Sequence, residues 1–188
     1  IVASNNLIWW DSRRWSKEAL ETMAETYSGK PFAIDHPYSV KDTVGFIYDA
    51  QIIESNAASD DILAGGGERI NNQAVFQAEG FIQMVCYAAI EARHPILSSI
   101  EFGRVGPVST GCISDGTQIC PLDYSPFGSQ SRYRYAEGHY HPQVAWWYDV
   151  EDPDLIAPYA IKSGVISSIE LSLVIMGNLP AAHIPKAG

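Results

Sequence analysis

The chain has 188 residues, enough for one domain or for one domain with a sizeable insertion, and 46% of them are hydrophobic. No apolar run approaches the ~20 residues that a helix needs to cross a bilayer, so a membrane is not an expected partner. Twelve basic against twenty-two acidic residues give a formal net charge of −10, which repels phosphate backbones and disfavours nucleic acid. Three cysteines form no disulfide framework in a chain this long, so an intracellular, reducing setting is expected.

The first elements predicted along the chain are a helix and two strands. Apolar residues recur at helical spacing behind Asp11 or Ser12, either of which can cap a helix, and this pattern predicts a helix over Ser12–Tyr27. The segments Pro31–Ile34 and Val44–Ile53 are typical of β-strands.

The middle of the chain mixes loop, strand and helix signals. Residues 55–68, rich in Ser, Asn, Ala, Asp and Gly, predict a loop. Alternation of apolar and polar side chains over Val75–Glu79 predicts a strand, whereas Ile82–Arg93 fits either a helix or a strand. Pro95–Phe102 predicts a short helix that leads to the segment around Ser109.

The last part of the chain divides into an unusual segment and a strand. Residues 112–160 are rich in Tyr, Ser, Pro, Gly and Asp, which predicts a loop-rich insertion into a single domain covering 1–188. The β-branched, apolar run Val165–Met176 predicts a buried strand. Together these elements indicate a β-rich α+β fold.

His36 is the first candidate for chemistry. It stands between Asp35 and Pro37, directly after an apolar segment. Because proline restricts the residue before it to extended geometry, the imidazole is expected at the end of a strand. A lone histidine in such a place is nevertheless more often a capping or packing residue than a catalytic one.

Ser109 is the second candidate, within the sequence Pro-Val-Ser-Thr-Gly at 107–111. The glycines Gly106 and Gly111 on either side predict a tight turn that exposes the hydroxyl and lets a substrate carbonyl approach the backbone. A plain turn serine is the competing interpretation. Thr110 is a weaker candidate for the same role.

Glu170 is the third candidate, because it lies inside the predicted buried strand. A carboxylate in a sheet core costs free energy unless it has a partner. Ser168, Glu170 and Ser172 alternate with apolar residues, so a solvated polar face of the strand is one interpretation. The other is that Glu170 meets a histidine.

The joint order of the three motifs is more specific than any one of them. The Asp-His-Pro motif of His36 is followed by a strand with a Val-Gly pair, Ser109 follows a short helix and a glycine, and Ile-Glu-Leu-Ser-Leu-Val stands at 169–174. In this order the motifs resemble the prohead maturation proteases of tailed phages, serine peptidases that share their fold with herpesvirus assemblin. The resemblance covers roughly residues 11–111 and 164–184.

The resemblance implies an assemblin-like barrel or curved sheet flanked by helices. It also implies that Ser109 is the nucleophile, that His36 is the general base and acid, and that Glu170 holds the imidazole. Backbone amides would stabilise the oxyanion, with Thr110 and Gly111 as the expected donors. No cofactor is required. Members of the family cut scaffold and capsid precursors inside the assembling prohead, and they often cut themselves as well. The resemblance therefore implies that these precursors are the partners and that the protein acts in the host cytoplasm. Self-association is compatible with this role.

The insertion at 112–160 departs from the compact members of that family. Cys112, Cys120, His139 and His141 could together make a tetrahedral zinc site. Their Cys-x7-Cys and His-x-His spacings match no common zinc motif, so incidental residues of an exposed loop are the alternative. The segment is also rich in tyrosine and tryptophan, which are enriched at protein contacts. A rival function is therefore a catalytically silent protein of the protease fold that acts as a decoration or scaffolding component of the capsid through this insertion.

Overall fold

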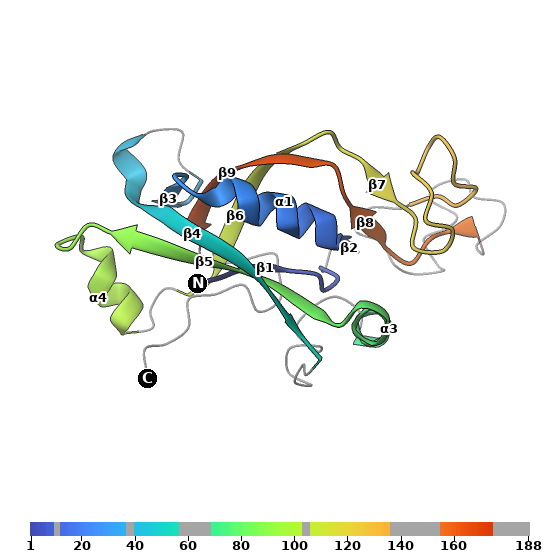
Figure 1. Cartoon of the computed structure of the whole chain (residues 1–188), viewed down its shortest axis with the longest axis horizontal. Coiled ribbons are helices and arrows are strands. Elements are labelled where there is room, and N and C mark those ends of the chain that lie inside the picture. Colours follow the sequence, from blue (N-terminus) through green and yellow to red (C-terminus); the bar gives the residue numbers. More distant parts are fainter. Residues whose placement is uncertain (10–11, 37–39, 57–68, 103–105, 136–154, 175–188) are drawn as a thin grey trace.

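A computed structural model of the chain describes residues 1–9, 12–36, 40–56, 69–102, 106–135 and 155–174. Its main feature is a six-stranded sheet with the strand order β1-β5-β4-β3-β9-β6 (Figure 1). The strands are β1 (Val2–Asn5), β3 (Pro31–Ile34), β4 (Thr43–Ser55), β5 (Phe81–Ile90), β6 (Val108–Ser114) and β9 (Val165–Leu173). Neighbouring strands run antiparallel except β3 and β9, which are parallel.

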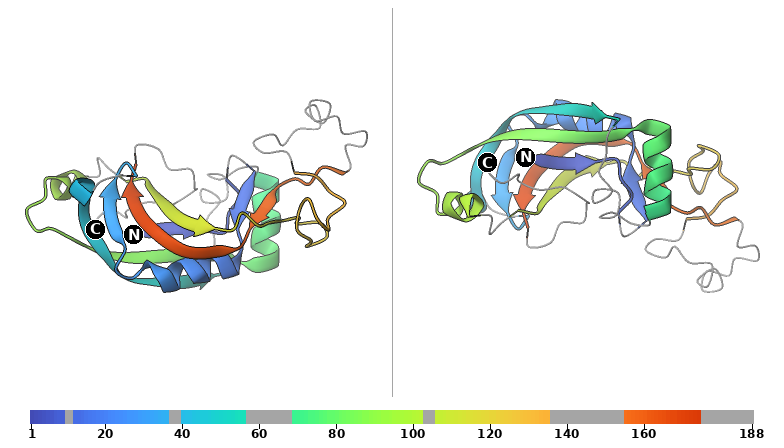
Figure 2. Two further views of the ribbon diagram at one scale, coloured as in Figure 1. Left: turned by 90° about the horizontal axis from the view of Figure 1, so that it is seen from above. Right: turned by 90° about the horizontal axis from the view of Figure 1, so that it is seen from below.

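The sheet curls strongly, as the two views of Figure 2 show. Its edge strands β1 and β6 approach each other, so the sheet forms a half-barrel. The protein is therefore an α+β protein rich in strands, which confirms the fold class predicted from the sequence.

One helix, α1 (Lys17–Tyr27), covers β4, β5 and β9 (Figure 1). Its buried face includes Leu20 and Met23, which join the core formed by the sheet. The helix begins later than the predicted Ser12–Tyr27, because Ser16 is the cap and accepts a hydrogen bond from the Ala19 amide at 3.1 Å.

The residues before Ser16 form a strand, β2 (Arg13–Trp15), instead of a helical turn. It pairs in parallel with β8 (Ala160–Lys162), which also pairs with β7 (Gln118–Ile119). These three strands make a small second sheet at one end of the molecule (Figure 1). The insertion thus begins inside β6 and contributes β7 and the first residue of β8 to this sheet.

The remaining elements are a short 3₁₀ turn, Val40–Asp42, and the helices α3 (Arg69–Glu79) and α4 (Ile96–Glu101). The strand predicted at Val75–Glu79 is wrong, because that segment is the second half of α3. Five residues are too few to separate a period of 2 from a period of 3.6, and the buried side chain of Val75 is explained by either.

Ile82–Arg93, open between helix and strand on sequence, lies mostly in β5, where both neighbouring strands supply hydrogen-bonding partners. The predicted helix at Pro95–Phe102 is α4, one residue shorter at each end. Most of the predicted loop at 55–68 lies outside the described residues. In the part of the chain that the structure describes, the helices are too short or too polar to cross a bilayer.

Candidate active site

His36 lies two residues beyond the end of β3, which pairs with β9 through residues that include Ala33 and Ser172. The Asp35 amide donates to the Leu173 carbonyl at 3.0 Å and extends this pairing by one residue. The backbone then turns, with φ of +54° at Asp35 and +49° at His36. The imidazole therefore lies at a strand end as predicted, but the extended geometry predicted for His36 is wrong. Two consecutive left-handed residues that are not glycine each cost about 1–3 kcal/mol, a strain typical of functional sites.

The His36 imidazole contacts the Glu170 carboxylate, although the two residues are 134 positions apart. The distance from His36 Nδ1 to Glu170 Oε1 is 2.8 Å. The Glu170 side chain is 11% exposed and that of His36 is 50% exposed. The carboxylate is thus sheltered from water, while the outer part of the imidazole remains accessible.

A solvated polar face on β9 is the interpretation that the structure overturns. Ser168, Glu170 and Ser172 are buried, whereas the apolar Ile169 between them is 47% exposed. The reason is an irregularity in the pairing with β6: Gly111 lies opposite Glu170, but the next residue of β6 lies opposite Ser168. Ile169 is therefore the extra residue of a β-bulge.

This bulge changes the side of the sheet on which Glu170 lies. Ser168 Oγ donates to the Met23 carbonyl of α1 at 2.9 Å, so Ser168 faces the helix. Leu171 also lies on the helix side, in the core cluster, so Glu170 faces away from the helix and toward His36. In a strand without the bulge, Ser168 and Glu170 would share a face.

α1 holds the backbone of Glu170 from the other side. The Tyr27 hydroxyl donates to the Glu170 backbone carbonyl at 2.7 Å. Burial raises the pKa of Tyr27 well above its ordinary value, so the hydroxyl remains a neutral donor.

Ser172 completes the arrangement around the carboxylate. Its hydroxyl donates to Glu170 Oε2 and accepts a hydrogen bond from the His36 backbone amide at 3.2 Å. Ser172 is fully buried. The two oxygens of Glu170 thus have separate partners, and one hydroxyl fixes both the carboxylate and the backbone that carries the imidazole. In the sequence, the sign of this contact was the two-residue spacing between Glu170 and Ser172. From the sequence alone, that spacing was equally compatible with a solvated polar face of the strand.

Gly111 supplies space for this carboxylate. A Cβ atom built on Gly111 would clash with Glu170 Oε1 and would lie 3.2 Å from Glu170 Cδ. Gly111 is not among the described glycines with a positive φ. The tight turn predicted around Ser109 and Gly111 is therefore wrong: both residues lie in β6, and Gly111 is needed because a side chain there would displace Glu170.

Ser109 lies opposite Ser172 in the antiparallel pairing of β6 and β9. Residues that are directly opposite share a face of the sheet, with Cβ atoms about 4.5–5.5 Å apart. Ser109, Ser172 and Glu170 are therefore on one face, and His36 reaches the same face from the end of β3. Within the described residues no hydrogen bond links Ser109 to His36. Such bonds are often long in an unliganded site and shorten when substrate binds.

The amides of the two expected oxyanion donors point in different directions. The Val174 amide donates to the Pro107 carbonyl at 3.1 Å, which makes this a hydrogen-bonded pair. Because such pairs alternate along an antiparallel ladder, the amides of Ser109 and Gly111 face β9, whereas that of Thr110 faces the outer edge of the sheet. Of the two, Thr110 has the amide that a substrate oxygen can approach.

A pocket of about 300 Å³, here called the β6 pocket, lies along this strand. It is lined by residues 108–112 of β6 together with Trp9, Trp15 and Lys162. Cys112 belongs to this lining, and burial raises the pKa of its thiol against the opposing effect of Lys162. The pocket therefore adjoins the candidate nucleophile and contains a neutral thiol.

The four zinc candidates are not brought together among the described residues. Cys120 is buried, and its Sγ accepts a hydrogen bond from the Leu122 amide at 3.4 Å. Cys112 lines the β6 pocket, and His139 and His141 lie outside the described residues. The described part of the chain contains no group of three or more side chains that could hold a metal ion.

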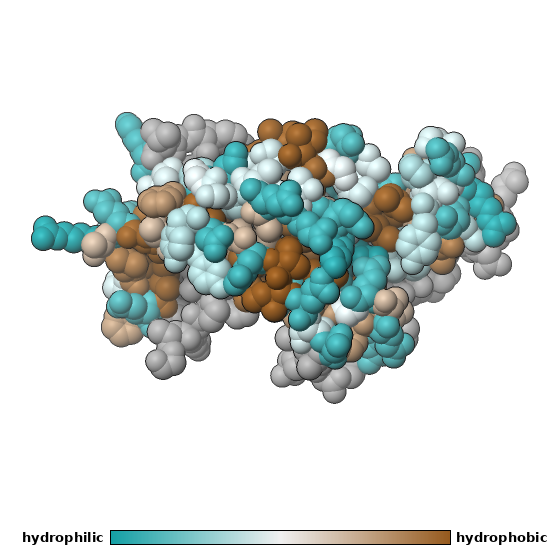
Figure 3. Space-filling view, viewed as in Figure 1, coloured by the Kyte–Doolittle hydropathy of each residue, from teal (hydrophilic) through white to brown (hydrophobic). Residues whose placement is uncertain are grey.

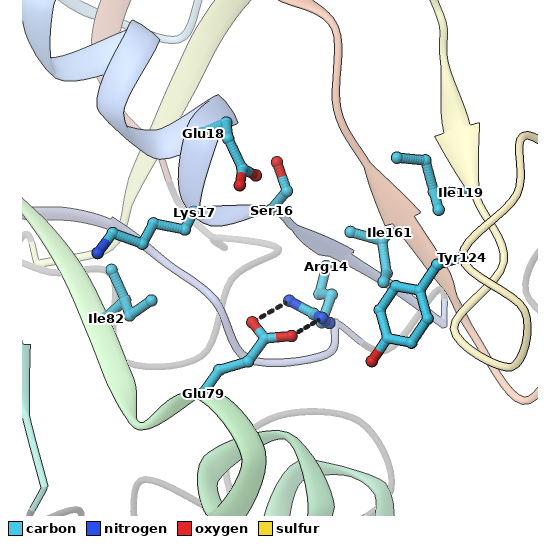
Figure 4. Close-up of a pocket in the computed structure, with 9 residues that line it drawn as sticks. All are labelled: Arg14, Ser16, Lys17, Glu18, Glu79, Ile82, Ile119, Tyr124 and Ile161. Carbon is cyan, nitrogen blue, oxygen red and sulfur yellow. Dashed lines mark hydrogen bonds and ion pairs between the residues drawn. The ribbon is translucent and has the colours of Figure 1, made fainter.

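A second pocket, of about 500 Å³, lies where the two sheets meet and contains none of the candidate catalytic residues (Figure 4). The guanidinium of Arg14, a residue only 2% exposed, binds both carboxylate oxygens of Glu79. The Lys17 ammonium at the rim binds Glu54. The cations of this pocket are thus matched by carboxylates, which is typical of a structural junction.

Comparison of the chain with known proteins finds no matching family model, no matching curated protein and no matching solved structure. Function is therefore inferred from the geometry of the site and from the order of the motifs.

Proposed function

We propose that the protein is a serine-type endopeptidase with Ser109 as nucleophile, His36 as general base and acid, and Glu170 as the group that orients the imidazole. The observation that carries the proposal is the 2.8 Å contact between His36 Nδ1 and Glu170 Oε1. It joins distant segments on the sheet face that also bears Ser109.

The geometry assigns each group a role. With Nδ1 donating its hydrogen to Glu170, His36 Nε2 is the nitrogen that can accept a proton. It takes the hydroxyl proton of Ser109 as Oγ attacks the scissile carbonyl carbon. The tetrahedral intermediate collapses, its C–N bond breaks, and His36 returns the proton to the departing amine. Water then attacks the ester by the same route and releases the acid and free Ser109.

The surroundings of Glu170 favour this chemistry. Because its carboxylate is sheltered from water, its attraction to the imidazolium that forms during the reaction is weakly screened. Ser172 and the space over Gly111 keep the carboxylate in place, so little reorganisation is required. The Thr110 amide at the sheet edge would stabilise the oxyanion. The mechanism requires no cofactor.

The biological setting is proposed from the resemblance. The order of the His36, Ser109 and Glu170 motifs supports a prohead maturation protease, and a curled half-barrel is compatible with an assemblin-like barrel. The substrates would then be scaffold and capsid precursor proteins, cut in the host cytoplasm inside assembling proheads. Self-association there would be a further interaction.

A structural capsid role without catalysis is the second candidate. It is favoured by large exposed side chains such as Phe102, which is 74% exposed, and Tyr124 of the insertion, which is 69% exposed. On the face seen in Figure 3, however, apolar side chains form several separate clusters, as on an ordinary protein surface. The hydrogen-bonded environment of Glu170 is also more elaborate than a docking role requires.

The test is labelling of the purified protein with a serine-directed fluorophosphonate, followed by mass spectrometry of the modified peptide. We expect an adduct on Ser109 that is lost in His36→Ala. The matched control is Ser114→Ala, at the other end of the same strand, which should label like the unchanged protein. A folded sample without an adduct, or with labelling that survives His36→Ala, would favour the structural role.

A further inference from the structure

The bulge at Ile169 places a buried backbone amide against α1. Ser168 is 1% exposed, and β3 pairs with β9 through Leu171–Leu173, which lie beyond this position. The Ser168 amide donates to Thr26 Oγ1 of α1 at 2.9 Å. Because a bulge disrupts the ladder of strand hydrogen bonds, a buried amide there needs an acceptor from elsewhere. Thr26 supplies this acceptor from outside the sheet.

The helix also fixes the hydroxyl groups on both sides of this contact. The Thr26 hydroxyl donates to the Thr22 carbonyl at 2.7 Å, so its oxygen is directed to accept from the Ser168 amide. The Ser168 hydroxyl donates to the Met23 carbonyl at 2.9 Å. The amide and the hydroxyl of Ser168 are thus bound by the last two turns of α1, which lies over β9 (Figure 1).

A second side chain of α1 binds the other side of the bulge. The Tyr27 hydroxyl donates to the Glu170 backbone carbonyl at 2.7 Å. Ile169 therefore lies between two residues whose backbone groups are held by the same helix. Thr26 and Tyr27 together leave the strand little freedom to return Ser168 and Glu170 to one face of the sheet.

We propose that Thr26 is a positioning residue of the proposed active site. By accepting from the Ser168 amide, it keeps the bulge in the form that directs Glu170 at His36. Without this acceptor, the amide is satisfied by regular pairing with β6, and regular pairing places Ser168 and Glu170 on one face. The effect on catalysis rests on the proposed function. The contact between His36 Nδ1 and Glu170 Oε1 does not, so it can be tested by itself.

The direct test is ¹⁵N NMR of the His36 imidazole, which reports the tautomer of the neutral ring in the folded protein and requires no turnover. In the unchanged protein the hydrogen should lie on Nδ1, where Glu170 accepts it. Thr26→Val keeps the shape of the side chain without its hydroxyl, and should lose both this tautomer preference and the downfield signal of the Nδ1 hydrogen. Thr26→Ser restores the acceptor and should restore both. His36→Ala assigns the signals.

Thr22→Val is the matched control, because it makes the same change one turn earlier on α1. Thr22 takes part in these contacts only through its backbone carbonyl, so this variant should keep the Nδ1 tautomer. Ser168→Ala removes the bond to the Met23 carbonyl and should weaken the preference, and it replaces Thr26→Val if that variant does not fold. A folded Thr26→Val protein that keeps the Nδ1 tautomer overturns the proposal.

Fluorophosphonate labelling then connects the bulge to the reaction. Thr26→Val and Tyr27→Phe should each slow labelling of Ser109 by at least about tenfold, whereas Thr26→Ser and Thr22→Val should stay within about twofold. Because both hydroxyls act through one bulge, the double variant should be slowed by clearly less than the product of the two effects. Full multiplication would show that they act independently and would overturn the shared role.

The two proposals fail in different ways. An unchanged protein that shows the Nδ1 tautomer but no labelling of Ser109 overturns the peptidase, and loss of that tautomer in Thr26→Val still supports the positioning role. Labelling that is lost only in His36→Ala, with no response to Thr26→Val, leaves the peptidase and overturns the role of Thr26.

Discussion

Two charged pairs tie distant parts of this chain together, and they differ in what they leave exposed. In the pair of Arg14 and Glu79, the cation is 2% exposed and its guanidinium is held by both oxygens of the carboxylate. In the pair of His36 and Glu170, the carboxylate is sheltered and half of the imidazole is accessible. The first arrangement immobilises both partners. The second fixes one nitrogen of a ring and leaves the other available, which is what proton transfer requires.

The largest effect should come from removing the nucleophile. Ser109→Ala should abolish fluorophosphonate labelling and lower any peptide cleavage by at least about 10,000-fold, because the neighbouring hydroxyl of Thr110 lies on the opposite face of β6. Stability in urea should be unchanged, since the Ser109 hydroxyl makes no hydrogen bond within the described residues and the substitution leaves the backbone pairing of β6 intact. Activity retained in this variant would contradict the assignment of Ser109 as the nucleophile, and the pair of His36 and Glu170 would then need another role.

Glu170→Gln should have the next largest effect. The amide keeps the shape of the carboxylate but loses the charge that stabilises the imidazolium, so labelling should slow by about 100- to 1,000-fold. The midpoint temperature of thermal unfolding, measured on the same variant, should change by a few degrees at most. A protein that unfolds instead would show that Glu170 is mainly structural and would remove the contrast between the two pairs.

The other pair should show the reverse behaviour. Glu79→Gln leaves the buried Arg14 guanidinium without a counter-charge and should lower the free energy of unfolding by about 2–3 kcal/mol, reduced from the usual cost because Glu79 is partly exposed. Urea denaturation measures this loss. The rate of Ser109 labelling in the folded fraction should stay within about twofold of the unchanged protein, and a larger loss would connect the second pocket to catalysis.

A smaller effect is expected from filling the space over Gly111. In Gly111→Ala the added methyl group would displace the Glu170 carboxylate, so labelling should slow by about 10- to 100-fold with the fold intact. Gly106→Ala is the matched control, because nothing lies within 4 Å of its added Cβ. Equal rates in the two variants would mean that the carboxylate can move without consequence.

The smallest effect concerns the buried thiol of Cys86, which belongs to neither pair. Burial raises the pKa of Cys86 from 9.0 to about 12 in the folded protein. Because the folded value is the higher one, the neutral thiol contributes stability below pH 9 that is lost as the pH rises toward 12. Cys86→Ala should therefore reduce the slope of unfolding free energy against pH in this range, as measured by urea denaturation. An unchanged slope would assign the alkaline loss to other groups such as Tyr27.

The sequence predicted those features that depend on local pattern. Pro31–Ile34 is a strand with the predicted bounds, and the apolar face of α1 is buried as its spacing indicates. The contact between His36 and Glu170 was expected from the resemblance and from the cost of a buried carboxylate. The start of α1 was missed, because the pairing of Arg13–Trp15 with β8 is a contact across the chain that local propensity does not report.

The site itself was less predictable in its details. A period of two residues places Ser168 and Glu170 on one face, and nothing in the composition of the strand reveals the bulge between them. The role of Ser172 depends on a backbone turn at His36 that the following proline argued against. The need for Gly111 arises from a side chain on another strand. Each of these features is set by pairing between strands, which becomes visible only when both strands are in place.

The bulge at Ile169 also means that this site is specified by length as much as by composition. Every side chain of the proposed site could be retained while one residue is inserted into β6 between Gly111 and Cys112. Ile169 would then have a partner, and regular pairing would place Ser168 and Glu170 on the same face, so that the contacts of Ser168 with the helix and of Glu170 with His36 could not both be kept. The register between two paired strands, shifted by a single residue, thus decides which face of the sheet carries the reactive group. A family of such proteins could gain or lose its chemistry by an insertion or a deletion without changing any of the residues that carry it.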